Sequence, residues 1–255
     1  MTKAPKYWAE AKKILSIDVD AAKQSPGVAL VMTGAELAEM CTGPWVGTLV
    51  CFDGMKSEPQ HPRAIDRAGW QGEPVVMVVA STRAEAEDAA ELVNVDYNPL
   101  DFVIDPEEAI KPDAPMVHPQ HGSNILCDKT WVWGSVDEDF SASSNRLKFR
   151  VKWSRNSTIP IETFVVTAKW DEGKNVLDVW ASIQMPKYPE QIARALGLPV
   201  NAINVHFDVD VGGSYGLKRG IRQTVIVSYL TRKLRAPVRF NEDRLENLSG
   251  GEMHG

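Results

Sequence analysis

The sequence of 255 residues has little of what marks several common protein classes. It contains only three cysteines, Cys41, Cys51 and Cys127, and none belongs to a C-x-x-C pair. This argues against a disulfide framework and against an iron–sulfur or zinc site. No stretch is long and apolar enough to cross a bilayer, and no signal-peptide core follows the lysines near the start. We therefore expect a cytoplasmic protein with reduced thiols and no membrane partner.

Basic residues are also fewer than acidic residues, 28 against 34. The net charge is −6 and there is no basic tail, so nucleic acid is not an expected partner. The residues that are present, 44% hydrophobic and 24% charged, are typical of a globular protein, and the length suffices for one large or two modest domains.

The first unit extends from residue 14 to about residue 105. Apolar runs predict strands over residues 14–19, 28–32 and 75–79. Two helix starts follow from Ser/Thr-x-x-Glu spacing, one from Thr33 to Glu36 and one from Thr82 to Glu85. Because a further strand is expected over residues 92–97, the second helix and the strands around it predict a compact β-α-β element.

A proline-rich segment between residues 105 and 123 predicts a linker between two domains. It contains His118 and His121, an H-x-x-H pair of the kind that binds metals when a rigid helix holds both rings. Pro119 and Gly122 argue against such a helix. We interpret the two histidines as polar linker residues and expect no metal ligand in this chain.

The second unit begins with Trp131, Trp133 and Trp153, which we interpret as packing residues in a core or an interface. A strand is expected over residues 150–153. Strands over 164–170 and 176–182, joined by a turn that contains Gly173, predict a hairpin.

Two loops in the second unit are of chemical interest. The strand over 176–182 leads to Gln184 and a helix over 188–196, and a strand over 203–209 leads to the glycine-rich loop 211–218 and a second helix. If the two strands are parallel neighbours, both loops open at the same edge of the sheet, where ligands of α/β folds bind.

The residue types at this edge fit an oxygen-bearing ligand. The Gln184 carboxamide can donate hydrogen bonds, and the backbone amides of Tyr215 and Gly216 can point at the same oxygen. Gly212 and Gly213 permit backbone conformations and close approaches that a Cβ would block. Donors without a charged side chain suit a neutral or oxo-bearing group.

Two segments of the second unit resemble sequences of one enzyme family. Ser182-Ile-Gln-Met-Pro186 and Val211-Gly-Gly-Ser-Tyr-Gly-Leu-Lys218 are similar to the ST-Q and GGGFGGK segments of the molybdenum hydroxylases. This family comprises xanthine dehydrogenase, aldehyde oxidase and aerobic carbon monoxide dehydrogenase.

Three further segments agree in the same order. Residues 72–100 resemble the family's GEPVA...AEDAAELV.V.Y.PL region, Pro160-Ile-Glu162 resembles PLEPR, and residues 237–248 resemble PV...EDR.E.L. The resemblance therefore covers nearly the whole chain, and five segments in family order make it specific.

The resemblance implies a mixed α+β and α/β fold. An a/b hammerhead domain over residues 1–110, incomplete at its N-terminus, would be followed by a linker over 111–126. The first portion of a molybdopterin-binding domain would occupy residues 127–255. By position, the family's cofactor contacts fall on the side chain of Gln184 and the amide of Gly216. The loop residues Gly212, Gly213, Ser214 and Tyr215 shape that contact.

The implied reaction is hydroxylation of a carbon centre of an aldehyde, an N-heterocycle or a similar molecule, with oxygen from water. Electrons would pass from a molybdenum–molybdopterin cofactor, expected in its cytosine dinucleotide form, to 2Fe–2S and FAD groups on partner subunits. The family's catalytic glutamate lies in a segment that this sequence does not contain. We therefore expect a part of a large subunit that is inactive until the remaining part completes it.

The departures from the family pattern are informative. Ser214 and Tyr215 replace the usual glycine and phenylalanine, which adds two hydroxyl groups. Arg219 stands where purine-oxidising members have a glutamate, so a purine substrate is not expected.

Several residues keep alternative interpretations. The basic residues of the last fifth of the chain either form a solvated face or subunit contact or meet cofactor phosphates; they are Lys218, Arg219, Arg222, Arg232, Lys233, Arg235, Arg239 and Arg244. Glu162 is interpreted as a structural hydrogen-bonding group, and His206 as a satisfied core residue.

Two alternative functions also stay open. The chain could be a noncatalytic assembly or interaction remnant of such a subunit. It could instead be a nucleotide-binding α/β domain, although the loop does not match G-x-G-x-x-G.

Overall fold

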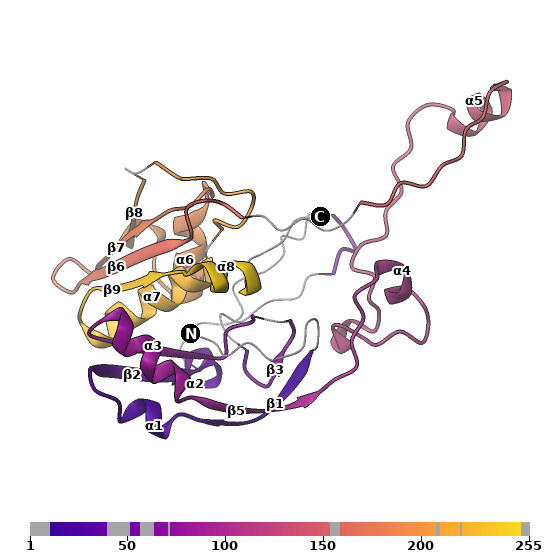
Figure 1. Cartoon of the computed structure of the whole chain (residues 1–255). Coiled ribbons are helices and arrows are strands. Elements are labelled where there is room, and N and C mark those ends of the chain that lie inside the picture. The colour runs from indigo at the N-terminus through magenta and orange to yellow at the C-terminus, as the bar shows by residue number, and fades with distance from the viewer. Residues whose placement is uncertain are drawn as a thin grey trace.

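The fold has two mixed α/β parts that lie against each other, and a long segment that extends away from both (Figure 1). The computed structural model describes residues 11–39, 52–56, 64–70, 72–153, 159–207, 210–219 and 221–250. The first ten residues, on which the expectation of an incomplete hammerhead domain depends, lie outside these ranges.

The first part contains the strands that the apolar runs predict. They are β1 (Lys12–Asp18), β2 (Val28–Thr33), β4 (Val76–Ala80) and β5 (Asn94–Pro99), together with the short β3 (Arg67–Ala68). Its helices are α1 (Asp20–Lys23), α2 (Gly34–Ala38) and α3 (Arg83–Glu91). Both predicted capping boxes are confirmed, because Thr33 caps α2 with Glu36 and Thr82 caps α3 with Glu85.

The predicted β-α-β element is wrong in its pairing. The order β4, α3, β5 is present, but β4 pairs antiparallel with β2, whereas β5 pairs antiparallel with β1 in a separate sheet of order β3-β1-β5. The apolar pattern explains the choice of partners. The apolar β4 lies beside the apolar β2, and β5 and β1 both carry charged residues that stay exposed.

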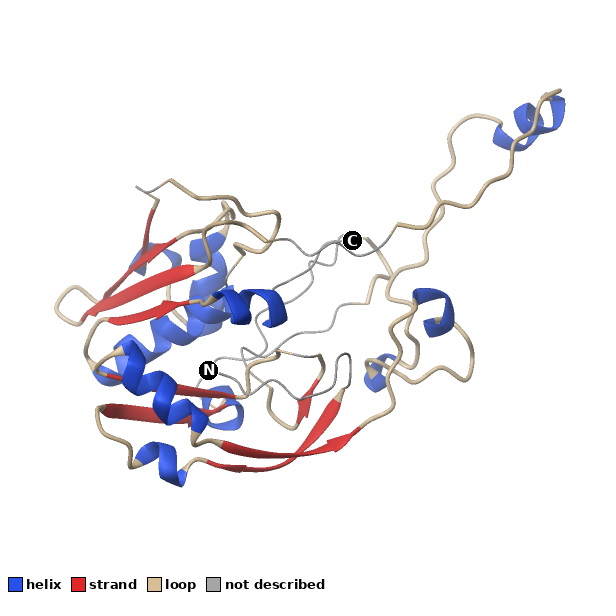
Figure 2. Ribbon diagram, viewed as in Figure 1, coloured by secondary structure: helices blue, strands red, loops and turns tan. Residues whose placement is uncertain are grey.

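The second part is a four-stranded sheet of order β8-β7-β6-β9 with helices packed on it (Figures 1 and 2). Its strands are β6 (Val165–Asp171), β7 (Val176–Ala181), β8 (Ile203–His206) and β9 (Val238–Asn241). The helices are α6 (Tyr188–Leu196), the 3-10 turn η2 (Val200–Ala202), α7 (Ile221–Leu234) and α8 (Arg244–Gly250). The predicted hairpin is confirmed as β6 and β7, which pair antiparallel. Of the predicted strand 203–209, β8 ends at His206, and residues 208 and 209 lie outside the described part.

One hydrophobic core joins the two parts. It contains the inward residues of the four-stranded sheet and of α6 and α7, and it also contains Met32, Leu37 and Met77 from the first part. A second, smaller core lies within the first part around Ala22 and Val76. The two parts are therefore held together by buried apolar surface as well as by the chain between them.

The segment between the two parts contains α4 (Pro106–Ala109), the 3-10 turn η1 (Pro119–His121) and α5 (Val136–Ala142). Beyond residue 126 it forms an arm, residues 127–153, which projects from the body with α5 at its far end (Figure 1). Every residue of the arm is exposed.

The arm corrects two predictions. Residues 150–153 form no strand, because no described strand pairs with them. Trp131, Trp133 and Trp153 are not core residues, since they are 49%, 74% and 74% exposed. Their interpretation as interface residues stays a prediction. Within the described ranges, no helix has the length and apolar character that a bilayer span requires.

Candidate functional site

The two loops singled out from the sequence lie at the same edge of the four-stranded sheet. β7 and β8 are parallel neighbours, with Leu177 opposite Ile203 and Trp180 opposite His206. The segment with Gln184 follows the carboxyl end of β7, and the glycine loop, residues 211–218, follows β8. The parallel pairing that the sequence argument required is confirmed, and it places both loops where ligands of α/β folds bind.

The two loops also touch through their backbones. The Gln184 amide donates a hydrogen bond to the Lys218 carbonyl at 3.1 Å. The helices that follow the loops are joined as well, because the hydroxyls of Tyr188 in α6 and Thr224 in α7 share a buried hydrogen bond. The Gln184 side chain is exposed, and Gly216 is half-buried. A fixed backbone with an exposed carboxamide is an arrangement that can present donors to a ligand.

The glycine loop has the backbone conformation that its composition predicts. Gly213 and Gly216 have φ of 90° and 91°, and Tyr215 between them has φ of 51°. A side chain at Gly213 or Gly216 would be strained in this left-handed region. Ser214 stabilises the turn, since its carbonyl accepts from the Leu217 amide at 3.0 Å and its hydroxyl accepts from the Lys218 amide at 3.2 Å.

Glu162 holds the loop from outside. Its Oε2 accepts a hydrogen bond from the Gly212 amide at 2.7 Å and another from Lys218 Nζ, so one carboxylate oxygen is bound to both ends of the loop. The Gly212 carbonyl accepts from the Glu162 amide at 3.3 Å. A Cβ on Gly212 would lie 2.7 Å from the Glu162 Cβ, which is too close for any side chain. The interpretation of Glu162 as a structural hydrogen-bonding group is confirmed.

Lys218 belongs to this clamp and not to a basic surface. Its side chain is buried, whereas a third of the Glu162 side chain is exposed. Burial opposes ionisation of Glu162, but the hydrogen bonds from Lys218 and Gly212 outweigh it, so the pKa of Glu162 is below its usual value. The interpretation of Lys218 as part of a solvated face is therefore wrong. The only sequence signal for the clamp was a cation at the end of a glycine loop.

The histidines lie elsewhere. The rings of His118 and His121 meet edge to face with centroids 6.0 Å apart, and the described residues contain no group of three or more side chains suited to a metal. His206 stacks on Trp180 at 4.6 Å between centroids and bonds Asp178 Oδ1 at 2.9 Å. It is half-buried at the sheet surface, so its interpretation as a core residue is wrong.

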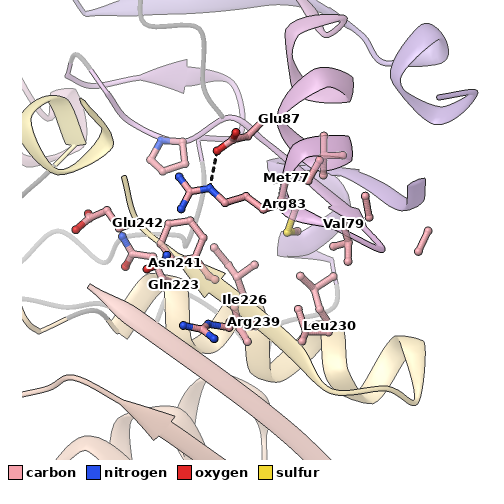
Figure 3. A pocket seen from close by; sticks show the side chains of 18 of the residues that line it. Met77, Val79, Arg83, Glu87, Gln223, Ile226, Leu230, Arg239, Asn241 and Glu242 are labelled. Carbon is pink, nitrogen blue, oxygen red and sulfur yellow. Dashed lines mark hydrogen bonds and ion pairs between the residues drawn. The ribbon is translucent and has the colours of Figure 1, made fainter. Parts of the chain in front are cut away.

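A cavity of about 870 Å³ lies between the two parts of the fold (Figure 3). Its walls come from β4 and α3 on one side and from α7 and β9 on the other. Arg83 is one of several charged side chains that line the cavity; its Nε lies 2.7 Å from Glu87 Oε1 and its Nη2 lies 3.9 Å from Asp243 Oδ2. Within the described part, none of the six residues of the two predicted loops lines this cavity. The cavity and the loop edge are therefore separate features, and the loop edge stays the predicted site.

Family models match two consecutive segments of the chain. The molybdopterin cofactor-binding domain matches residues 117–254, more than half of the chain. The a/b hammerhead domain of aldehyde oxidase and xanthine dehydrogenase matches residues 8–101. The expected fold class, a hammerhead domain followed by a molybdopterin-binding domain, is confirmed.

Curated relatives and solved structures agree with these matches. The chain is 32% identical to the nicotine 6-hydroxylase large subunit of Paenarthrobacter nicotinovorans, over 94% of this chain and 29% of that protein. It is 31% identical to the carbon monoxide dehydrogenase large chain of Afipia carboxidovorans, over 93% and 30%. The structure of quinoline 2-oxidoreductase from Pseudomonas putida 86 matches all of this chain and 32% of that one, with 30% identity and a TM-score of 0.90. The chain thus spans about 30% of the length of these relatives.

Proposed function

This chain belongs to the aldehyde oxidase and xanthine dehydrogenase family of molybdopterin enzymes, and we propose that it forms one part of the large subunit of a molybdenum hydroxylase. The whole enzyme would oxidise a carbon centre with oxygen derived from water. The observation that carries the proposal is the hydrogen bond between the Gln184 amide and the Lys218 carbonyl, which joins the two loops at one sheet edge.

The residues at this edge fit a molybdopterin cofactor. The exposed carboxamide of Gln184 and the amide of Gly216 would donate hydrogen bonds to it, and Gly212, Gly213, Ser214 and Tyr215 would shape the cradle. Side chains at the two glycines would disturb this loop. A Cβ at Gly212 would collide with Glu162, and Gly213 has a positive φ that strains other residues. When bound, the cofactor would supply the two-electron redox chemistry.

The protein groups have a positioning role in this proposal. Glu162 and Lys218 neutralise each other and hold the loop, so that its amides are already oriented before a ligand arrives. Preoriented donors in a partly buried site stabilise negative charge without reorganisation. The catalytic base would come from a segment that this chain does not contain.

The substrate and the other components are proposed from the relatives. Their names include a nicotine hydroxylase and a quinoline oxidoreductase, which act on N-heterocycles, and a carbon monoxide dehydrogenase. We propose an aldehyde or a non-purine N-heterocycle as substrate, since Arg219 stands where purine-oxidising members carry glutamate.

The cofactor would be the cytosine dinucleotide form, and partner subunits would carry 2Fe–2S and FAD. We propose domain boundaries at 1–110 and 127–255 with a linker over 111–126, and we expect no activity without the rest of the large subunit.

Molybdenum content of the complex that contains this chain tests the proposal. Elemental analysis of the purified wild-type complex should find molybdenum, and Gly212→Ala should lose most of it because the new Cβ collides with Glu162. Gly173→Ala is the matched control. It lies in the β6–β7 turn, where a Cβ would meet the Asp171 side chain at 3.4 Å, an ordinary contact.

The outcomes separate the alternatives. A wild-type complex without molybdenum would contradict the proposal, and bound nucleotide in its place would favour a nucleotide-binding domain. A folded complex with neither would favour a noncatalytic remnant. Equal molybdenum in Gly212→Ala and wild type would show that the glycine loop is not the cofactor contact.

A further inference from the structure

The arm, residues 127–153, exposes an unusual amount of apolar surface. Nine of its large apolar side chains are between 49% and 87% exposed: Trp131, Val132, Trp133, Val136, Phe140, Leu147, Phe149, Val151 and Trp153. Soluble monomers rarely expose contiguous apolar patches of this kind, and such patches mark interaction sites. The arm contacts the rest of the chain through Phe52, which meets Trp131 edge to face at 5.3 Å, and through the ion pair of Arg150 with Glu107.

The returning half of the arm has the sequence pattern of a strand. In residues 146–153 the apolar Leu147, Phe149, Val151 and Trp153 alternate with four basic residues. Strict alternation puts the apolar side chains on one face of an extended chain and the basic side chains on the other. In the described part of the chain, however, no strand pairs with these residues and no backbone hydrogen bond to them is formed.

Such a segment is suited to strand addition. Unpaired N–H and C=O groups beside an apolar face can pair with the edge of another sheet, and the apolar face then packs on the core beneath that sheet. The sequence predicted a strand at residues 150–153, and the isolated chain lacks only the partner strand.

A second copy of this chain does not suit the segment. Two identical segments that pair antiparallel with their apolar faces on the same side would also place their basic faces side by side. Lys148 and Lys152 of one copy would then stand near the same residues of the other, and like charges on paired strands repel. The partner strand must carry neutral or acidic residues on that face.

We propose that residues 146–153 add as a strand to a sheet in the remaining part of the large subunit. The apolar surface of that remaining part then covers the arm. The inference rests on the proposed function. The range that the molybdopterin cofactor-binding family model matches, residues 117–254, includes the arm, and the structural match to quinoline 2-oxidoreductase covers the whole chain. About 70% of the length of the curated relatives lies outside the segment that this chain matches, which provides the required occupant.

Site-specific crosslinking tests the proposal in the native complex, purified through a tag on this chain. Phe149 is replaced by the photoreactive p-benzoylphenylalanine, and the crosslinked peptides are identified by mass spectrometry. We expect crosslinks to the part of the large subunit that carries the continuation of the molybdopterin-binding sequence. Amides over residues 146–153 should exchange with deuterium at least tenfold more slowly in the complex than in the chain alone.

Matched double variants separate the two faces of the segment. Phe149→Glu with Val151→Glu, on the apolar face, should lower the recovered complex at least tenfold. Lys148→Gln with Lys152→Gln, on the basic face, should leave most of it. Because the arm is exposed in the isolated chain, circular dichroism and urea unfolding of both variants should match wild type, which controls for misfolding.

Each outcome decides something. Crosslinks to a second copy of this chain, to its own body or to a subunit that carries iron–sulfur or flavin groups would overturn the proposal. Full recovery of the complex with the apolar-face variant would do the same. A complex with the expected crosslinks but without molybdenum would contradict the proposed function and leave the strand addition standing.

Discussion

The glycine loop and the returning half of the arm, residues 146–153, both lack regular secondary structure, yet they differ in burial and in backbone hydrogen bonding. The loop, residues 211–218, has backbone hydrogen bonds to Glu162 and to the Gln184 segment, and it encloses the buried Lys218. The returning half of the arm has exposed side chains throughout and, in the described part, no backbone partner. An irregular segment is thus well defined where its polar backbone groups have partners. Where the backbone groups have no partners, as in residues 146–153, they are free to pair with another surface.

The largest contrast is expected for one substitution made in the body and in the arm. Leu177 in β7 is fully buried, and Leu147 in the arm is 87% exposed. Leu177→Ala should lower the free energy of unfolding by about 2–5 kcal/mol, because it leaves a cavity in a packed core. Leu147→Ala should change it by less than about 0.5 kcal/mol. Urea unfolding measures both, and a large effect of Leu147→Ala in the isolated chain would break the comparison.

The clamp on the loop should give the next largest effect. Glu162→Ala leaves the buried Lys218 without its carboxylate, and we expect a loss of about 2–4 kcal/mol, somewhat below the range for fully buried pairs because Glu162 is a third exposed. Glu172→Ala removes the exposed pair with Arg235 and serves as control, with an expected loss of less than about 1 kcal/mol. Equal losses would mean that the clamp contributes no more than a surface ion pair.

A half-buried carboxyl in the body, that of Glu73, adds a test by pH. Burial raises the pKa of Glu73 from 4.5 to about 7, against the Gly69 amide and the charges of Arg222 and Arg67, which lower it. The folded state holds the Glu73 proton more tightly than the unfolded state does. The stability that this proton contributes to the fold is therefore fully present below pH 4.5. It is lost as the pH rises to 7, by up to about 3 kcal/mol.

Glu73→Gln removes this titration. The variant should match wild type near pH 4 and be more stable above pH 7. Thermal unfolding across this range measures the difference, and parallel stability curves for the two proteins would contradict the shifted pKa.

The smallest contrast compares glycines in the two irregular segments. Gly212→Ala puts a Cβ 2.7 Å from the Glu162 Cβ and should cost about 1–3 kcal/mol. Gly134 in the arm has φ of 66° and open space around it, so the methyl group of Gly134→Ala meets no neighbouring atom and strains only the local backbone of the exposed arm. Its effect on urea unfolding should stay within about 0.5 kcal/mol, and a larger effect would show that the stability of the body depends on this turn.

Much of the fold could be predicted because its signals are local. The capping boxes at Thr33 and Thr82 and the β6–β7 hairpin each depend on neighbouring residues, and each is present. Pairing between distant strands could not be predicted in the same way. The sequence places β4 and β5 on either side of α3. That β4 pairs with β2 and β5 with β1, in different sheets, depends on which strands pair best with one another.

The candidate site likewise has features that the sequence order predicts and features that depend on distant contacts. The placement of Gln184 and the glycine loop at one edge follows from strand, loop and helix order, and the parallel pairing of β7 and β8 realises it. The role of Lys218 did not follow, because its partner Glu162 is distant in the chain and a lysine next to Arg219 gives no sign that it is buried.

The sequence by itself determined the positions of the helix caps, the glycines that need positive φ, and the family, because these depend on residue type and short spacing. The tertiary structure alone decided that one oxygen of Glu162 binds both ends of the glycine loop and that three tryptophans of the second unit are exposed. Burial is the physical reason. Whether a side chain is inside depends on which distant surfaces meet it, and for the arm we propose that those surfaces belong to the remaining part of the large subunit.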